Sequence, residues 1–453
     1  MSNKDVNNFE LIKKEDMLKI HNMSVRILSE IGLNIYSEEI RNFLKKNGAE
    51  VKDSCRVCFN EKILEKALKT VPSEIKIFDR LGKKALELSG HNIYFGTGSD
   101  LKYTIDWKTK KRRTSTLKDV ELSAKLCDRL KNIDFVMSNA LPQEITGNDN
   151  EYEQFKTMFS NTNKPVIITN FSGISILAKM HKLACDLCGG EENFKSSPNY
   201  ILYSQFISPL QFHSESLDRL SYCAKKGIPV IYVPTIMMGA TGPVTVAGAI
   251  GLANAECLAG LIIHQLINPG SPYIYGGCVS PLDMKTSVFS YGSPEWRITD
   301  SVLSQLSKFY KIPIFGTAGA TDSNIVNVQA GAEWTCSLLI SALSGTNLIH
   351  DVGYRESGLT GSLESLVICN EIIGKVKRIV SGFEINENTL AFDIIKEVGP
   401  GGNFLSQEHT LKYFLDEVWY PSVFVRKRIE TEALDKQDDV FDLTNKFIEK
   451  IFD

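Results

Sequence analysis

One stretch of the sequence places small, polar and acidic residues directly after a run of apolar ones. Residues 312–334, IPIFGTAGATDSNIVNVQAGAEW, lead from a β-type apolar run through Gly316 and Gly319 to Asp322 and then into an alanine-rich segment. This order predicts a buried strand, a polar glycine loop and a helix. Glycines allow a large flat ligand to approach the backbone closely. An acid beside such a loop either offsets the charge of a bound cation or caps the following helix.

Other apolar runs end in aromatic and ionisable residues that suit a cationic ligand. Tyr94 and Phe95 lie in NIYFG, and NLIHDVGYRESGL carries His350, Tyr354 and Glu356. Aromatic faces attract a cation that has no hydrogen to donate, such as a quaternary ammonium, and a histidine can donate to a substrate carboxylate. Core packing, a structural histidine and helix capping explain the same residue types about equally well. The residues expected to bind substrate are Tyr94, Phe95, His350, Tyr354, Asp322 and Glu356.

Several common reactions lack the residues that they need. No lysine lies at the end of an apolar run, which disfavours a Schiff-base aldolase. No pair of histidines stands with a carboxylate, so we expect no metal site. Two CxxC pairs, at residues 55–58 and 185–188, are interpreted as buried or incidental thiols rather than as one zinc site. The glycine runs at residues 96–98 and 399–402 match neither a dinucleotide fingerprint nor a P-loop. The sequence assigns no catalytic residue.

Eight apolar, β-rich segments must position these residues. Most are continuous apolar runs, as parallel strands buried on both faces require. Helix-period segments separate them, and this alternation favours a (βα)8 TIM barrel of the α/β class over an open doubly wound sheet. In such a barrel the reactive end is the rim, where strands run into the loops before helices. The segments are residues 92–96, 134–141, 165–173, 199–210, 228–243, 272–283, 312–334 and 347–359.

The barrel is expected at residues 89–383, with additions on both sides. Residues 1–88 contain three amphipathic helical patterns, and residues 384–453 contain helical segments that we expect to cap the barrel. The first residues lack the apolar core of a signal peptide, and no uninterrupted apolar stretch reaches about 18 residues. We therefore expect a cytoplasmic protein without a membrane span, whose ten cysteines are reduced thiols.

The charge balance argues against nucleic acid as a partner. The 453 residues carry a formal net charge of -3. The basic run KTKKRR at residues 108–113 stands alone, so it is better interpreted as a solvated loop than as a nucleic-acid patch. A docking patch for an acidic partner protein is the alternative interpretation.

Three long motifs together resemble one known family. They are IPIFGTAGATDSNIVNVQAGAEW, IHDVGYRESGLTGSLESLVICNEIIGKVKRIV and GPGGNFLSQEHTLKYFLDEVWYPSVF, and the chain that carries them resembles the trimethylamine:corrinoid methyltransferases over most of its length. The resemblance implies a (βα)8 barrel that transfers a methyl group from an amine to the Co(I) of a corrinoid (cobalamin) on a separate small protein. The chain has no Asp-x-His-x-x-Gly cobalamin-binding motif, which agrees with a separate cognate corrinoid protein and with no tightly bound corrinoid.

The same resemblance bears on the substrate. Family members that act on trimethylamine carry pyrrolysine in the barrel, and this sequence contains none. It is similar to the branch without that residue, whose substrates are quaternary amines such as glycine betaine, proline betaine, carnitine or γ-butyrobetaine. A quaternary nitrogen that loses a methyl group leaves as a neutral tertiary amine. The enzyme then has only to align the N–CH₃ bond with the cobalt and to remove water. The glycines expected to let the corrin ring approach are Gly316, Gly319, Gly276 and Gly277.

Alternatives to this function remain open at the level of sequence. The methyl donor could be a tertiary amine or another methyl compound. The chain could also be a betaine-binding paralogue without turnover, or a phosphosugar isomerase barrel that binds phosphate after its last two strands. We further expect the protein to be a homo-oligomer.

Overall fold

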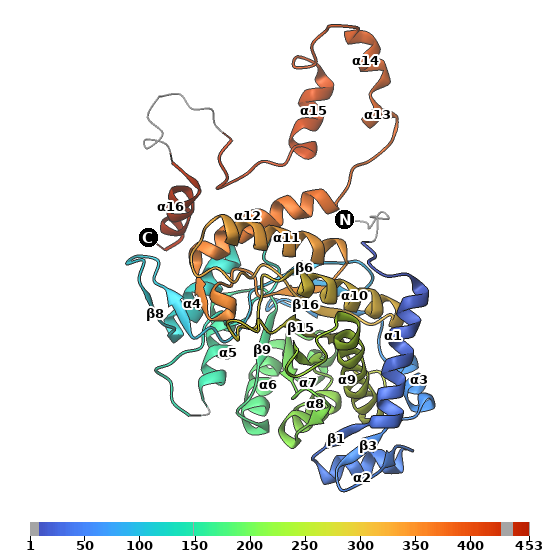
Figure 1. Cartoon of the computed structure of the whole chain (residues 1–453). Helices are drawn as coiled ribbons and strands as arrows, with labels where there is room; N and C mark the ends of the chain where they lie inside the picture. The colour runs from blue at the N-terminus through green and yellow to red at the C-terminus, as the bar shows by residue number, and fades with distance from the viewer. Residues whose placement is uncertain (1–8, 148, 427–437, 453) are drawn as a thin grey trace.

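A closed barrel of parallel strands forms the centre of the chain, in a computed structural model that describes residues 9–147, 149–426 and 438–452 (Figure 1). Seven strands form one sheet in the order β6-β17-β16-β14-β12-β10-β9. Parallel bridges from Gly96 to Phe135 and from Val136 to Val166 join its two edges. The predicted (βα)8 barrel is confirmed, although the segment 134–141 contributes two bridges instead of a strand. The strands are β6 (Tyr94–Phe95), β9 (Val166–Thr169), β10 (Tyr200–Gln205), β12 (Val230–Val233), β14 (Tyr273–Gly276), β16 (Ile314–Thr317) and β17 (Leu348–His350).

The burial of the strands explains why their sequences are apolar without alternation. Every residue of β9, β12, β14, β16 and β17 is buried, because one side of each strand faces the barrel interior and the other faces a helix. Two strands continue towards the rim as β13 (Thr235–Met238) and β15 (Cys278–Pro281), which pair with each other in parallel.

Helices pack around the outside of the barrel (Figure 1). Ser362 accepts a hydrogen bond from the backbone N–H of Ser365 at 3.1 Å and caps the last barrel helix. The helices are α4 (Leu117–Arg129), α5 (Asn150–Asn161), α6 (Ile174–Cys188), α7 (Glu191–Ser196), α8 (Ser214–Lys226), α9 (Val246–Ile267), α10 (Pro294–Tyr310), α11 (Val328–Leu343) and α12 (Leu363–Val380).

Helix α9 differs from the others because it is apolar on all sides. Among the described residues it is the one helix long and apolar enough to cross a membrane by length and composition. However, 83% of its most apolar window is buried inside the protein, where α1 (Lys14–Arg26) and α3 (Glu61–Thr70) pack over it. Because a core helix packs against other elements on every side, all of its faces are apolar.

A β-hairpin closes the amino-terminal end of the barrel. The strands β4 (Ile75–Phe78) and β5 (Lys84–Leu88) insert Ile75, Ile77, Leu86 and Leu88 among the residues that point into the barrel. Each buried aliphatic side chain of this size contributes about 1.5–3 kcal/mol, which secures a hairpin that is marginal by itself. The sequence prediction assigned only helices to residues 1–88, so this plug was missed.

The rest of the N-terminal flank is mixed in structure. The three predicted helices are present as α1, α2 (Glu38–Lys46) and α3. A π-helical turn, η1 (Ile27–Ile31), follows α1, and a small sheet lies between the helices. Its strands are β1 (Leu33–Ile35), β2 (Glu50–Val51), β3 (Arg56–Cys58) and β11 (Gln211–Phe212).

The rim and the C-terminal flank complete the chain. Three short strands, β7 (Tyr103–Ile105), β8 (Arg112–Thr114) and β18 (Thr360–Ser362), form a sheet at the rim, beside the 3-10 turn η2 (Glu356–Gly358). The helices α13 (Glu387–Leu390), α14 (Phe392–Val398) and α15 (Glu408–Glu417) project away from the barrel (Figure 1). Helix α16 (Val440–Phe452) returns to it and packs against α12.

Candidate functional site

His350 ends the last barrel strand and is held rigidly. Its ring stacks on Phe315 with 3.9 Å between ring centroids. Its Nδ1 lies 2.8 Å from the carbonyl oxygen of Gly316, so Nδ1 carries the hydrogen and donates. Burial lowers the pKa of His350 to about 3, so the ring is neutral at physiological pH. Its Nε2 is then an acceptor.

Asp351 lies next to that acceptor. One of its carboxyl oxygens is 3.3 Å from Nε2 of His350, and both side chains are buried. Asp351 has a positive φ of 70°, an uncommon conformation for a residue with a side chain. Burial raises the pKa of Asp351 well above its ordinary value, and the charge of Asp100 raises it further. The carboxyl group therefore retains its proton and donates it towards His350.

Three tyrosines and a second acid surround Asp351, and we call Asp100, Asp351, Tyr203, Tyr291 and Tyr354 the tyrosine–aspartate cluster. Tyr203 lies 5.2 Å from Phe315 and 6.0 Å from His350 between ring centroids, and Tyr291 lies 6.4 Å from Tyr354. Burial raises the pKa of all three phenols, and ionisation of the neighbouring Asp351 would raise each pKa further. The cluster thus combines aromatic faces with acids at the carboxyl end of the barrel.

Hydrogen bonds with neighbouring residues fix the orientation of the side chains in the cluster. The Tyr354 hydroxyl donates to the Ser99 carbonyl, and the Gln205 amide donates to the Tyr203 hydroxyl. Asp100 accepts from Thr169 Oγ1 at 3.1 Å. Asp100 and Tyr291 remain partly exposed, whereas Tyr203 and Tyr354 are buried below them. Packing around Asp100 raises the pKa of its carboxyl group as well.

Such a cluster is suited to a permanent cation. Burial and mutual repulsion both oppose the ionisation of the two acids. A bound cation supplies an opposite charge that favours their ionised forms. Aromatic faces bind a desolvated cation without requiring a hydrogen-bond donor. Of the residues predicted to bind substrate, the structure brings His350 and Tyr354 into this cluster. Asp100, Asp351, Tyr203 and Tyr291 were not predicted as binding residues.

Tyr94 and Phe95, the predicted aromatic wall, lie away from this cluster. Tyr94 pairs in register with Leu348, two residues before His350, and its hydroxyl accepts from the backbone N–H of Glu87 on the hairpin plug. Phe95 points outward, where the ammonium of Lys377 lies 5.6 Å from its ring centre. The rim begins later than the apolar run indicates, and the first acid there is Asp100.

Asp322 and Glu356 already have partners within the chain. Asp322 accepts from the backbone N–H groups of Tyr291 at 2.7 Å and Gly292 at 3.0 Å, and from the hydroxyls of Ser290 and Ser357. It therefore fastens the loop that carries Tyr291 over the cluster. Glu356 forms an ion pair with Arg112 at 2.9 Å. Both carboxylates are engaged by these partners, and Asp322 lies beside Tyr291 of the cluster.

The basic run at residues 108–113 pairs much of its charge with acids of the same chain. Arg112 pairs with Glu356, and Arg113 forms ion pairs with Asp106 at 3.1 Å and with Asp119 at 2.7 Å. These pairs hold the hairpin of β7 and β8 against the rim. The run therefore has a structural use that does not involve a partner.

The four glycines that were predicted to let a corrin ring approach lie against other residues of this chain. A Cβ at Gly316 would lie 2.9 Å from the Thr346 methyl, and a Cβ at Gly319 would lie 3.0 Å from the Cα of Val352. At Gly276 it would approach the Phe315 carbonyl oxygen under 3.0 Å, and at Gly277 it would lie 3.4 Å from the Pro234 ring. Packing therefore explains Gly316, Gly319 and Gly276, whereas the space at Gly277 would accept a Cβ at ordinary van der Waals distance.

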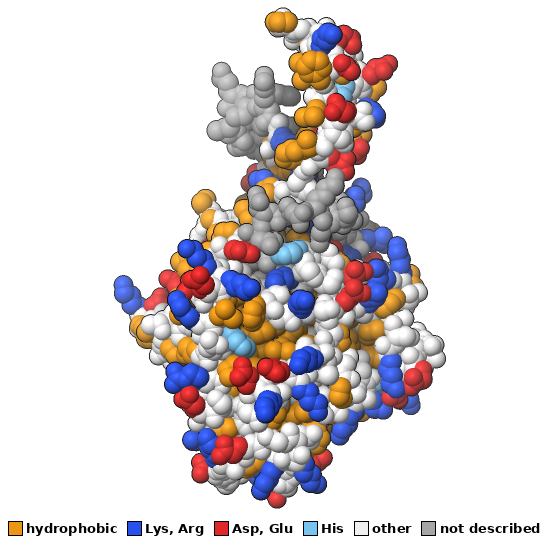
Figure 2. Space-filling view, turned by 90° about the vertical axis from the view of Figure 1, so that its right-hand side faces the viewer, with side chains coloured by type: hydrophobic (Ala, Val, Ile, Leu, Met, Phe, Trp, Pro, Cys, Tyr) orange, Lys and Arg blue, Asp and Glu red, His pale blue; other side chains and the backbone are white. Residues whose placement is uncertain are grey.

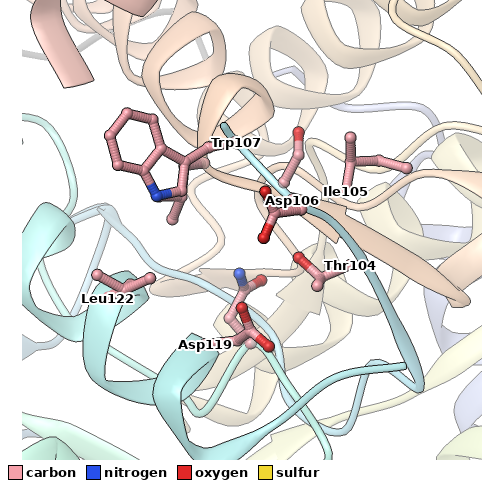
Figure 3. A pocket seen from close by; sticks show the side chains of 9 residues that line it. Thr104, Ile105, Asp106, Trp107, Asp119 and Leu122 are labelled. Atoms are coloured by element: carbon pink, nitrogen blue, oxygen red, sulfur yellow. The ribbon is translucent and has the colours of Figure 1, made fainter. Parts of the chain in front are cut away.

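The described residues also line cavities away from the cluster. One of about 10 Å³, near the volume that holds a single water, lies between the rim sheet and the starts of α4 and α12 (Figure 3). It is lined by Thr104, Ile105, Asp106, Trp107, Asp119, Leu122, Asn139, Ser362 and Leu363. A second, of about 300 Å³, lies between the hairpin turn at Leu81 and the loop around Ser197. Within the described residues no group of three His, Cys, Asp or Glu side chains is arranged to hold a metal ion.

Comparison with known proteins relates the whole chain to a family. The model of the trimethylamine methyltransferase (MTTB) family matches residues 2–453. The chain belongs to the trimethylamine methyltransferase family. It is 32% identical over 432 residues to the glycine betaine methyltransferase of Desulfitobacterium hafniense (strain Y51), covering 94% of this chain and 89% of that protein. It is also 32% identical over 400 residues to the trimethylamine methyltransferase MttB of Desulfitobacterium hafniense (strain DSM 10664 / DCB-2), covering 87% and 80%. The chain is therefore a methyltransferase of a corrinoid-dependent amine methyltransferase family.

A solved structure supports the fold independently of the sequence. The monomethylamine methyltransferase MtmB of Methanosarcina barkeri covers 99% of this chain and 90% of its own, with a TM-score of 0.52. Sequence identity is 11%, so this likeness concerns the fold alone. It agrees with the (βα)8 barrel.

Proposed function

We propose that this methyltransferase takes a methyl group from a quaternary amine of the betaine type and transfers it to the Co(I) corrinoid of a separate protein. The observation that carries the proposal is the tyrosine–aspartate cluster, where buried Asp351, partly exposed Asp100 and three phenol rings meet at the rim. The name of the Desulfitobacterium relative, glycine betaine methyltransferase, supports the same substrate class.

The side chains of the cluster would bind and orient the substrate. The ammonium would lie against Tyr203, Tyr291 and Tyr354. Asp100 and Asp351 would balance its charge, and Asp351 would lose its proton as the cation enters. The stacked pair of Phe315 and His350 forms the floor, so the N–CH₃ bond that reacts must point towards the rim.

The burial of the cluster also excludes water from a bound substrate. Tyr203, Asp351 and Tyr354 are each less than 8% exposed. A cation held there loses its hydration shell, and the protein replaces it with fixed rings and carboxylates. The amine leaves neutral, so no residue has to protonate it. This agrees with a cluster in which His350 is engaged with Gly316 and Asp351.

The rim is suited to a large partly apolar group brought by another protein. Six rim loops in succession, those after β9, β10, β13, β15, β16 and β17, each expose a large apolar side chain. A ring of exposed apolar residues around a polar centre is typical of an interaction surface. A Co(I) corrinoid delivered there supplies the nucleophile for the methyl group. The six residues are Phe171, Ile207, Val244, Met284, Ile325 and Leu359.

Methyl transfer can be tested directly. The purified protein is mixed with a Co(I)-corrinoid carrier protein and glycine betaine, the corrinoid absorption spectrum is followed, and dimethylglycine is measured. Appearance of dimethylglycine with the spectral change is expected. Betaine binding without dimethylglycine would instead indicate a binding protein, and absence of both would overturn the proposal for this substrate.

The pH dependence of binding separates a quaternary from a tertiary amine. The raised pKa values of Asp100 and Asp351 predict that affinity for any cation rises with pH as these acids ionise. Glycine betaine keeps its charge, so its affinity should then stay level. A tertiary amine deprotonates at alkaline pH, and its affinity should fall again. Titrations of both ligand types from acidic to alkaline pH measure the difference.

A further inference from the structure

A row of uncharged polar side chains crosses the inner face of the barrel at the rim. It consists of Gln205, Thr235, Cys278 and Thr317, and we call it the neutral row. Its members lie on β10, β13, β15 and β16, which follow one another around the barrel because β13 and β15 continue β12 and β14. Figure 2 shows Lys, Arg, Asp and Glu side chains mixed over the outside of the molecule. The neutral row differs, because each member carries an N–H, O–H or S–H donor without a formal charge.

The strands turn the neutral row towards the interior of the barrel. Alternate residues of a strand lie on the same face. Each member of the row follows, by two or four residues, a side chain of the cluster that fills the barrel interior. These four preceding residues are Tyr203, Val233, Ile274 and Phe315. The row is therefore the layer that lies directly above the apolar interior.

The register of the strands brings the members of the row close together. Gln205 pairs with Val233, and Thr235 lies two residues further towards the rim. Thr235 pairs with Cys278, whose Sγ atom lies 3.7 Å from Oγ1 of Thr317. Neighbouring strands are about 4.8 Å apart, so adjacent members of the row can contact the same small group.

Two members of the row have donors that the protein itself does not use. Oγ1 of Thr235 is buried and has no hydrogen-bond partner among the described residues. The Gln205 amide donates one hydrogen to the Tyr203 hydroxyl, and within the described chain its second hydrogen has no acceptor. Both residues are partly exposed, and rotation about χ1 of Thr235 turns its hydroxyl towards a ligand that enters from the rim. Unused donors of this kind are uncommon in a folded protein and indicate a ligand.

The neutral row borders the tyrosine–aspartate cluster. Gln205 contacts the cluster through the hydroxyl of Tyr203. Burial raises the pKa of the Cys278 thiol to about 12, and an ionised Asp351 close by adds to this shift. The thiol therefore stays protonated beside the cluster. A small ligand whose ammonium group lies in the cluster has its other end at the row.

The ionisable groups close to the row are not available to bind an anion. His350 donates from Nδ1 to a backbone carbonyl, and its Nε2 is an acceptor. Arg297 donates to the Thr317 carbonyl at 2.6 Å and lies 3.6 Å from Asp300, and both of these side chains are buried. A free base in the row would also repel the ammonium group of the ligand at short range. Neutral donors bind a carboxylate without that repulsion.

We propose that the neutral row binds the carboxylate of the substrate, with the side chains of Gln205 and Thr235 as donors. The enzyme then selects quaternary amines that also carry a carboxylate over those that carry only the cation. This inference rests on the proposed function, because it takes the ammonium group to lie in the tyrosine–aspartate cluster. Hydrogen bonds to an ionised carboxylate are stronger than those between neutral groups, so the loss of one donor is measurable.

The test measures the Kd of glycine betaine and of tetramethylammonium by titration calorimetry. Tetramethylammonium carries a quaternary nitrogen without a carboxylate. Its Kd divided by that of glycine betaine, the selectivity ratio, therefore reports the contacts of the carboxylate. We expect a ratio of about ten or more for the unchanged protein, and a fall of about tenfold in Thr235→Val, which replaces the hydroxyl by a methyl group. Thr235→Ser keeps the hydroxyl and should keep the ratio.

Thr444→Val is the matched control for the lost hydroxyl. Oγ1 of Thr444 is also buried without a partner in the described chain, but it lies on α16, outside the barrel. The selectivity ratio should not change in this variant. Thermal melts of all the variants show which of them are folded, and the comparison of the two ligands on the unchanged protein needs no variant.

Gln205→Met is the second variant, and it removes the other donor. It also releases the Tyr203 hydroxyl, and any displacement of that ring changes the Kd of both ligands, whereas the selectivity ratio follows the carboxylate. A fall of the ratio in either variant that is absent from Thr444→Val supports the inference. A ratio near one in the unchanged protein, or an unchanged ratio in both Thr235→Val and Gln205→Met, would overturn it and leave the cation site in place. Binding of neither ligand would overturn it together with the proposed function.

Discussion

The carboxyl group of Asp351 faces the Nε2 atom of His350 at 3.3 Å, in a part of the barrel closed to solvent. Two unprotonated acceptors would repel each other at this distance. Burial lowers the pKa of the histidine to about 3 and raises the pKa of the aspartic acid, so the proton stays on the acid. The site at rest is thus a neutral pair that can release a proton when a cation arrives.

Replacing Asp351 by Asn tests this exchange. The Asn side-chain amide can still donate to His350, so the resting arrangement is kept, but the charge that balances the ammonium is lost. We expect the Kd for glycine betaine to rise about tenfold to hundredfold. Calorimetry in two buffers of different ionisation enthalpy should also show fewer protons released than in the unchanged protein. Equal Kd and equal proton release would show that Asp351 does not sense the ligand.

A methyl group at position 98 should disturb the cluster without unfolding the barrel. A Cβ at Gly98 would approach the carboxyl group of Asp351 and the Tyr354 hydroxyl under 3.0 Å. Gly98→Ala is expected to weaken betaine binding more than tenfold, because both groups must shift. Gly331→Ala is the control, since a Cβ on this helical glycine meets nothing within 4 Å. Binding isotherms and thermal melts of both variants measure the effect, and intact binding by Gly98→Ala would contradict this role.

Asp322 and Glu356, the two acids predicted from the sequence to bind substrate, should behave differently from Asp351. Asp322→Asn removes an acceptor from the loop that carries Tyr291, so a Kd increase of a few fold is expected through a displaced ring. Glu356→Gln breaks only the ion pair with Arg112, whose side chains are 41% and 31% exposed. Such a pair contributes about 1 kcal/mol or less to the free energy of unfolding, and betaine affinity should not change. A larger loss of affinity in Glu356→Gln than in Asp322→Asn would reverse these assignments.

The barrel was predictable because each apolar run reports burial on both faces of a strand. The site was harder to predict because a continuous apolar run does not tell where the strand ends. Tyr94 and Phe95 therefore lie below the rim, while Asp100, five residues further along the chain, reaches it. Glu356 is satisfied by Arg112, which is 244 residues away in the sequence, and no local pattern reveals such a partner.

The structure of the N-terminal flank and the contacts of the glycines were also hard to predict, because both depend on residues distant in the sequence. The apolar residues of the hairpin of β4 and β5 lie outside the three predicted helical patterns, and no strand was predicted for them because nothing in the sequence shows the barrel end that they fill. Gly316 and Gly276 do lie at the ends of strands, as predicted. What they accommodate is a side chain or a carbonyl of a neighbouring element, and this depends on packing in three dimensions.

Glu256 offers a test of electrostatics away from the cluster. This buried residue of α9 accepts from the Leu210 backbone N–H and from the Ser208 hydroxyl, and burial raises its pKa from 4.5 to about 7. An acid with a raised pKa binds a proton more readily in the folded state than in the unfolded state. Its contribution to stability is therefore greatest below its unfolded pKa and is lost as pH rises towards 7.

Glu256→Gln should remove this pH dependence. The Gln side-chain oxygen keeps an acceptor for Leu210 without a charge to bury, so the variant should be more stable than the unchanged protein at pH 8 by roughly 1–3 kcal/mol. At pH 4.5 the two should be nearly equal, because Glu256 is then protonated in the folded state. Urea unfolding at both pH values measures the difference. A variant that is less stable at pH 8 would mean that the ionised carboxylate is better satisfied in the fold than its burial indicates.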